Sequence, residues 1–147
     1  MTQHLQTVLP TYEAALWQSQ AYRALRMFMD ETLSRHQLSM SEWSLLGHTY
    51  DQGEVRASDL AQILSVELPL VTKLVNRMEQ NGLVQRTANQ QDRRTKLVSL
   101  TPQGKEMVER IELGLRESLR DYLIDVSPPN LSVYLSVLQT IARKLSK

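Results

Sequence analysis

The sequence predicts a mainly helical domain with one small β-hairpin. Apolar residues make up 41% of the 147 residues but aromatic residues only 5%, and leucine dominates the apolar set, which favours helices packed on helices. Long segments carry apolar residues at helical spacing, whereas two short β-branched stretches flank a polar loop near residue 90. A chain of this length is expected to form one ordinary domain with its own core.

The composition also excludes several functions. The chain contains no cysteine, so disulfides, thiolate metal sites and thiol-based redox sensing are ruled out. No apolar run approaches the roughly 20 residues that a membrane span requires, and the segment 1–10 lacks the basic and apolar regions of a signal peptide. We therefore expect a cytoplasmic protein without a membrane partner.

The charge is unevenly distributed along the chain. The formal net charge is only +1, but residues 65–100 contain six basic and three acidic residues, which leaves a net charge of −2 for the rest. A basic middle between acidic flanks is typical of a nucleic-acid-binding face on a neutral scaffold.

The first half of the chain predicts three helices. A long helix is expected over 11–35, because the segment lacks glycine and proline. Ser39 to Glu42 form a capping box, and Leu38 and Trp43 occupy the positions of a hydrophobic staple, so a second helix should run to about Tyr50. Its buried face is expected to include Trp43, Leu46 and Tyr50. A short helix should follow over 57–64.

A fourth helix is predicted over 67–81. Val71, Leu74, Val75 and Met78 form a stripe at helical spacing that should face the core. Gly82 then fits a left-handed C-terminal cap, after which Leu83 should fold back onto Met78.

The remaining elements are a hairpin and two more helices. Strands are expected over 84–87 and 96–100, joined by a polar loop over 88–94. The Thr101 and Pro102 pair should open a helix that reaches Val126. Residues 127–130 should break it, and a last helix should cover 131–145.

Two short helices followed by a basic hairpin predict a winged helix-turn-helix, in which the second helix enters the DNA major groove. The segments RASDLAQILSVELPLVTKLVNRMEQNGLVQR (56–86) and DRRTKLVSLTPQG (92–104) resemble the core of the MarR family. This resemblance covers nearly the whole chain and implies a homodimer. Residues 1–38 and 101–147 would then form a helical dimerisation region, and residues 39–100 the winged helix-turn-helix lobe that binds double-stranded DNA.

The candidate DNA-binding residues follow from the helix over 67–81. At 100° per residue, its face opposite the apolar stripe carries Pro69, Lys73 and Asn76, with Thr72 and Arg77 beside them. Lys73 and Arg77 could neutralise phosphates, Arg77 could also read guanine, and the Asn76 amide could read adenine. An ordinary solvated helix face is the alternative.

Three further features extend this interface. Leu70 departs from the polar residues usual in the family, and we hypothesise that it touches a thymine methyl group. The resemblance implies that Arg93 or Arg94 reaches the minor groove or the backbone, while Asp92 helps to hold the loop.

The resemblance also implies a small aromatic or phenolic effector. Trp17, Tyr22, Arg23, Arg26 and His48 could line its cleft, although a core role is the alternative for each.

Other activities have weaker support in the sequence. His4, His36 and His48 are scattered without a second ligand at metal-binding spacing, so no metal or other cofactor is expected. No set of residues resembles a catalytic site, which argues against an enzyme. The sequence therefore predicts a ligand-responsive transcriptional regulator, most often a repressor, on a pseudo-palindromic operator. A winged-helix protein-interaction module without DNA binding, suggested by the apolar Leu68 and Leu70, remains the alternative.

Overall fold

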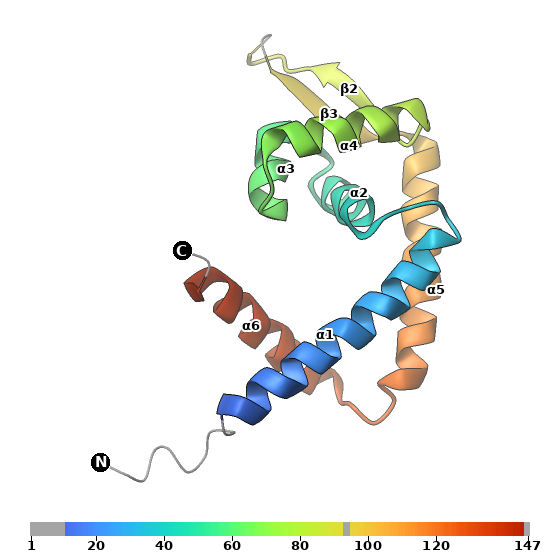
Figure 1. The fold of residues 1–147 in the computed structure, drawn as a ribbon. Coiled ribbons are helices and arrows are strands. Elements are labelled where there is room, and N and C mark those ends of the chain that lie inside the picture. The colour runs from blue at the N-terminus through green and yellow to red at the C-terminus, as the bar shows by residue number, and fades with distance from the viewer. Residues whose placement is uncertain (1–10, 93–94, 146–147) are drawn as a thin grey trace. The chain divides into compact units, whose positions relative to one another are not determined.

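The computed structural model describes residues 11–92 and 95–145 and confirms a mainly helical fold with a small antiparallel sheet. Figure 1 shows the path of the chain through its elements, which are α1 (Thr11–Ser34), α2 (Met40–Gln52), β1 (Glu54–Arg56), α3 (Ala57–Leu64), α4 (Leu68–Gln80), β2 (Val84–Ala88), β3 (Lys96–Leu100), α5 (Pro102–Tyr122) and α6 (Pro128–Leu145). In the described part of the chain, no helix is both long enough and apolar enough to cross a membrane. The fold divides into two compact units, Met1–Arg110 and Ile111–Lys147.

Helix α2 begins at the predicted capping box. The Ser39 hydroxyl accepts from the Glu42 backbone N–H at 3.3 Å, and the Glu42 carboxylate accepts from the Ser39 backbone N–H at 2.8 Å. The buried face differs from the prediction, because Leu46 is buried but Trp43 is only half-buried and Tyr50 is exposed. The face follows helical spacing through the smaller side chains instead, namely Glu42, Leu45, Leu46 and Thr49.

Tyr50 remains at the surface because its hydroxyl has a partner there. It donates a 2.8 Å hydrogen bond to Oε1 of Glu109, on the first turns of α5. This bond, together with the negative charge of Glu109, raises the pKa of Tyr50. The aromatic ring was expected in the core, but its polar end requires solvent or a polar partner.

Helices α3 and α4 form the helix-turn-helix. Ser65 adopts a left-handed conformation with φ of 53°, and the N–H of Val66 donates to the carbonyl of Ala61 at 3.0 Å, so the chain reverses within a few residues. The core side of α4 agrees with the predicted stripe, since Val71, Val75 and Met78 are buried and Leu74 is half-buried.

Helix α4 ends in the predicted glycine cap. Gly82 has φ of 73° and donates to the carbonyl of Glu79 at 3.0 Å, while Leu83 donates to the carbonyl of Met78 at 2.9 Å. This pair of bonds is a Schellman motif, and both Leu83 and Met78 are buried. The chain therefore turns back along α4 into β2.

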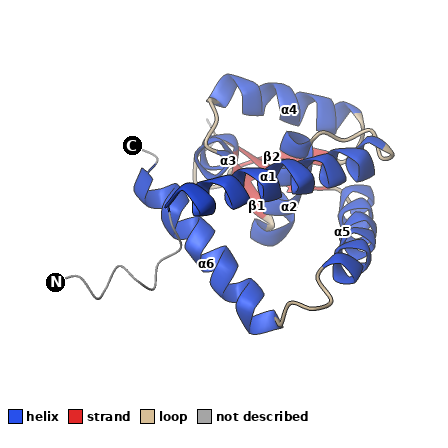
Figure 2. Ribbon diagram, turned by 60° about the horizontal axis from the view of Figure 1, so that its bottom comes forward, coloured by secondary structure: helices blue, strands red, loops and turns tan. Residues whose placement is uncertain are grey.

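The sheet contains three strands in the order β1, β3, β2, all antiparallel (Figure 2). Val84 lies opposite Leu100, and Ala88 lies opposite Lys96, so β2 is one residue longer than predicted. Strand β1, in which Val55 pairs with Val98, was not predicted. Three residues are too few to reveal the alternation that identifies a strand.

The start of α5 packs closely on the end of α4. The Thr101 side chain accepts from the Gly104 backbone N–H at 3.0 Å and donates to the Gly82 carbonyl at 2.6 Å. A Cβ on Gly104 would lie 2.0 Å from the Leu83 carbonyl oxygen, so only glycine permits this approach. The predicted cap at Thr101 is therefore confirmed, and it also joins two elements.

The ends of the last two helices differ from the prediction. Helix α5 ends at Tyr122 and not at Val126, although apolar residues continue to Val126. The ring of Pro128 disfavours a helical residue before it, so the chain leaves the helix a few residues earlier. Helix α6 begins at Pro128 and not at Leu131, because a proline in the first turn loses no helical hydrogen bond.

Candidate nucleic-acid interface

One side of α4 faces away from the core and carries the predicted polar residues. Pro69, Thr72, Lys73 and Asn76 are all exposed. The Thr72 hydroxyl donates to the Leu68 carbonyl at 3.0 Å. The Lys73 ammonium has no ion pair with any residue that the structure describes, so its charge is available to an external anion.

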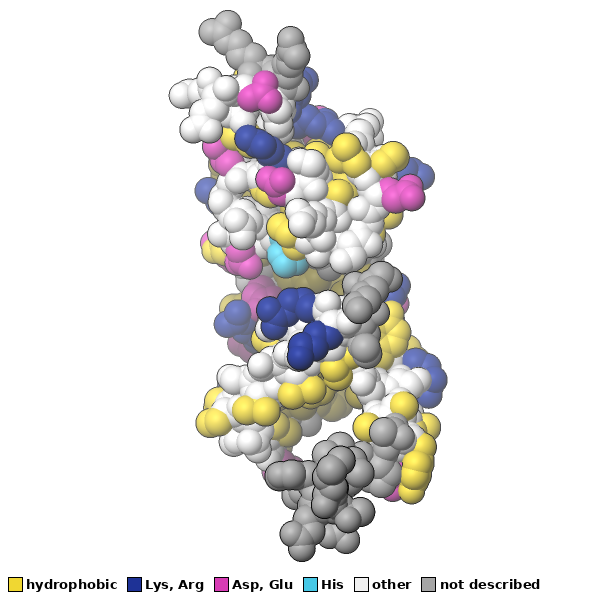
Figure 3. Space-filling model, turned by 90° about the vertical axis from the view of Figure 1, so that its left-hand side faces the viewer, with side chains coloured by type: hydrophobic (Ala, Val, Ile, Leu, Met, Phe, Trp, Pro, Cys, Tyr) yellow, Lys and Arg dark blue, Asp and Glu magenta, His cyan; other side chains and the backbone are white. Residues whose placement is uncertain are grey.

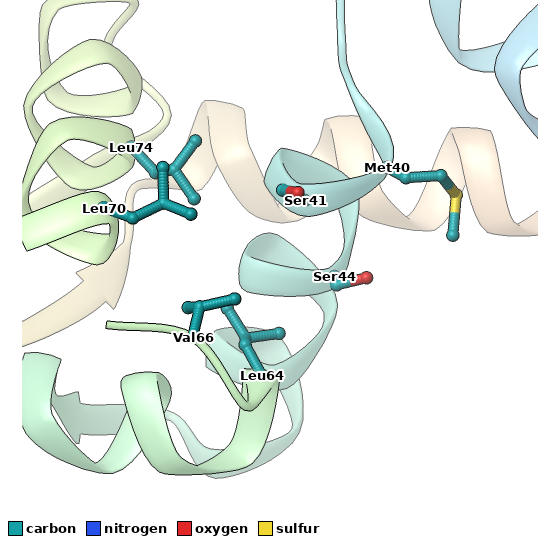
Figure 4. A pocket seen from close by; sticks show the side chains of 7 residues that line it. All are labelled: Met40, Ser41, Ser44, Leu64, Val66, Leu70 and Leu74. Carbon is teal, nitrogen blue, oxygen red and sulfur yellow. The ribbon is translucent and has the colours of Figure 1, made fainter. Parts of the chain in front are cut away.

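Leu70 lies toward α2 on the same helix. Figure 4 shows Leu70 and Leu74 on α4 across a shallow space from Ser41 on α2, with Leu64 and Val66 below. The volume of this mostly apolar groove is about 120 Å³. Leu70 therefore contributes to the wall of the groove, although its side chain is still 41% exposed.

Arg77 also lies on this edge of α4. Its Nε is 3.1 Å from Oε1 of Glu42, whose side chain is only 1% exposed, while the Arg77 side chain is 58% exposed. The contact is an ion pair by distance but lacks the geometry of a hydrogen bond. The other Glu42 oxygen accepts from both the N–H and the hydroxyl of Ser39. Glu42 thus links the start of α2 to a cationic side chain on α4.

The sequence did not reveal a second cluster, centred on Arg86 of β2. One Arg86 nitrogen, Nη1, forms an ion pair with Glu79, and Nη2 donates to Oδ1 of Asn76 at 2.5 Å. Figure 1 shows β2 alongside α4, which explains how strand and helix residues meet. Arg86 is 21% exposed and Glu79 41% exposed. The predicted base reader Asn76 is therefore held by a residue outside its own helix.

The loop between β2 and β3 is organised by two side chains. The buried Asn89 accepts from the Gln91 N–H at 3.0 Å through Oδ1. Asp92 accepts from the Thr95 hydroxyl at 2.7 Å and, through its carbonyl, from the Thr95 N–H at 2.9 Å. The predicted wing residues Arg93 and Arg94 lie outside the described residues.

Charge is mixed on the molecular surface. On the face drawn in Figure 3, dark blue basic side chains lie among magenta acidic and yellow hydrophobic ones. Ion pairs such as Arg86 with Glu79 cancel part of the basic charge of residues 65–100. The exposed Lys73 and Lys96 form no ion pair with a described residue, so they carry the uncompensated charge of this lobe.

The residues predicted for an effector site are exposed on α1. The side chains of Trp17 and Tyr22 are each 63% exposed. Arg26 accepts no proton but donates to the Tyr22 hydroxyl at 3.2 Å and to Asp30 at 3.1 Å, and these partners raise the pKa of Arg26. Arg23 donates to Ser19 at 3.0 Å.

The histidines do not form a metal site in the described part of the chain. His36 and His48 are half-buried, His4 lies outside the described residues, and the described acidic and histidine side chains form no group of three that could hold a metal ion.

The fold and the exposed second helix define a winged helix-turn-helix protein. The profile described as MarR family matches residues 38–96. The chain is 32% identical over 107 residues to YwoH, an uncharacterised HTH-type transcriptional regulator of Bacillus subtilis, and the match covers 73% of this chain and 77% of that relative. The chain belongs to the MarR family of transcriptional regulators, whose members are DNA-binding regulators and not enzymes.

Solved structures agree with this fold. The chain is 20% identical to MarR from E. coli complexed with operator DNA, with a TM-score of 0.72 over 86% of this chain and 91% of that one. It is also 20% identical to NadR in complex with 4-hydroxyphenylacetate, with a TM-score of 0.77 over 95% and 96% of the two chains.

Proposed function

We propose that this regulator is a homodimer that binds a pseudo-palindromic operator through α4 and the wing, and that it represses transcription in the cytoplasm until an effector releases it. The outward side of α4 carries this proposal, because Thr72, Lys73 and Asn76 stand together on it and are exposed. Two such helices, one per subunit, would meet successive major-groove turns about 34 Å apart. In this arrangement Pro69 and Arg77 would flank the contact.

The wing would contact the adjacent backbone or minor groove through Arg93 and Arg94. Asp92 supports this role, since its hydrogen bonds to Thr95 close the loop that presents the two arginines. We expect Arg94→Ala to weaken duplex binding by at least about 1 kcal/mol and to flatten its salt dependence. An unchanged salt dependence would argue against this role.

The dimer is supported by the apolar surface of the terminal helices. Large apolar side chains of α1 are exposed, and so are those of the C-terminal part of α5 and of α6, including Leu16, Tyr122, Val133, Leu135 and Val137. Monomeric soluble proteins rarely expose so many neighbouring apolar side chains. A second copy of the chain would cover them.

The proposed effector is a small aromatic or phenolic acid. NadR was crystallised with 4-hydroxyphenylacetate, and α1 presents Trp17, Tyr22 and Arg26, which could stack on a ring or pair with a carboxylate. The ligand would act by shifting the dimer between DNA-competent and incompetent arrangements. Titration of 4-hydroxyphenylacetate into the DNA complex tests this step, and release of the duplex is expected.

Protein interaction without DNA binding is the second candidate. The groove beside Leu70 favours it, because Leu68 and Leu70 are both exposed on the presenting helix. An apolar partner would bind independently of salt, whereas phosphate neutralisation makes DNA binding fall steeply with salt.

The decisive experiment measures binding of the purified full chain to its own upstream promoter and to random duplex over a range of salt concentrations. We expect tighter binding to the promoter and a linear fall of log affinity with log salt. A chain that stays monomeric and ignores both duplexes at low ionic strength would refute the proposal.

A further inference from the structure

Asn76 is the exposed amide at the middle of α4, and its oxygen is engaged within the protein. Nη2 of Arg86 donates to Asn76 Oδ1 at 2.5 Å, while Nη1 of the same guanidinium pairs with Glu79. Helix α4 supplies both acceptors and β2 supplies the arginine. The Asn76 amino group, Nδ2, has no hydrogen bond with a described residue.

The orientation of this amide follows from chemistry. A guanidinium has only donors, so the amide of Asn76 must present its oxygen and not its amino group to Arg86. Arg86 holds two partners at once and is only 21% exposed, which restricts its movement. The amide plane is therefore fixed, and the Asn76 amino group is the part left for an external partner.

This arrangement changes what Asn76 can recognise. Reading adenine requires an amide that directs both its oxygen and its amino group at one base edge, because adenine presents an acceptor beside a donor. Turning the oxygen of Asn76 outward would break its bond to Arg86. Guanine presents two adjacent acceptors, N7 and O6, in the major groove, and an amino group with two N–H donors matches them.

We infer that Asn76 acts as a donor that selects guanine over adenine, and that Arg86 is the positioning residue that sets this choice. The inference rests on the proposed insertion of α4 into the major groove. It replaces the adenine contact that the amide alone would suggest. Arg86 has a second effect, since its pairing with Glu79 neutralises a carboxylate that would otherwise repel the nearby phosphates.

The test is selection of bound duplexes from a randomised pool by the full chain and by three variants. Asn76→Ala removes the amino group, Arg86→Ala releases the amide, and Arg35→Ala is the matched control. Arg35 also pairs with a glutamate, Glu31 at 3.0 Å, but on α1. The preferred site is then measured with single-base substitutions at fixed salt.

We expect the unmodified chain to prefer guanine over adenine by about fivefold to tenfold at one position in each half-site. Asn76→Ala should abolish the preference at that position only. Arg86→Ala should shift the preference there toward adenine, because the freed amide can offer both its donor and its acceptor. Arg35→Ala should leave the preference unchanged.

A second variant guards against a loss of folding. Arg86→Lys retains a group that only donates, so it should keep the guanine preference even where overall affinity falls. The inference is overturned if Arg86→Ala binds DNA with an unaltered base preference, or if Asn76→Ala changes no position. Failure of the proposed function looks different, because the unmodified chain would then bind no duplex at all.

Discussion

Glu42 allows a quantitative test of the fold. Its carboxylate is 1% exposed and accepts two hydrogen bonds from Ser39 while it faces Arg77. A hydrogen bond to a charged group contributes about 1.5 to 3 kcal/mol, and loss of a helix cap costs about 1 kcal/mol. The ion pair adds less than about 1 kcal/mol, because the Arg77 side chain is 58% exposed and solvent screens it.

We therefore expect Glu42→Ala to lower the free energy of unfolding by about 3 kcal/mol. Glu42→Gln keeps an acceptor for the Ser39 N–H and loses only the charge, so it should cost about 1 kcal/mol. Urea unfolding at one fixed protein concentration measures both values, because dimerisation makes stability depend on concentration. Equal losses for the two variants, or a loss below about 1 kcal/mol for Glu42→Ala, would refute this reasoning.

Further predictions concern helix α5 and the DNA contact. Gly104→Ala should cost about 3 kcal/mol, because its Cβ would lie 2.0 Å from the Leu83 carbonyl oxygen. Gly114→Ala is its matched control on the same helix, with nothing within 4 Å, and should be neutral or stabilising by up to about 1 kcal/mol. Thr101→Val removes the N-cap acceptor and should cost about 1 to 2 kcal/mol in the same unfolding assay. Lys73→Ala should weaken duplex binding and reduce the slope of log affinity against log salt by about one unit.

These outcomes can each fail in a recognisable way. Equal stability of the two glycine variants would show that the Leu83 contact is not tight, and an unaffected Thr101→Val would show that the cap contributes nothing. A Lys73→Ala chain with the original salt slope would exclude a phosphate contact at that position.

Most of the fold could be predicted because its signals are local. The capping box at Ser39, the left-handed Gly82 and the apolar spacing of α4 each act within a few residues, so the sequence alone was sufficient. Strand β1 was missed because its three residues are held by pairing with β3, which is distant in sequence. The core role of Tyr50 was wrong because its partner, Glu109, is 59 positions away.

The candidate site was only partly accessible for the same reason. Helical spacing correctly placed Lys73 and Asn76 on the exposed side of α4. It could not show that Asn76 is held by Arg86, which lies ten positions further on. One signal was present, however. A strand advances about 3.3 Å per residue and a helix about 1.5 Å, so a chain that reverses at Gly82 brings β2 residues beside the middle of α4.

Leu83 belongs to two helices at once. Its N–H donates to Met78 in the last turn of α4, and its carbonyl accepts from the Thr101 N–H at the start of α5. The wing between them, residues 84–100, is therefore an excursion from a junction that is already closed at its base. Insertions or substitutions in the outer part of the wing can alter what it touches without loosening that junction, so this segment can diversify while the two helices still move as one piece.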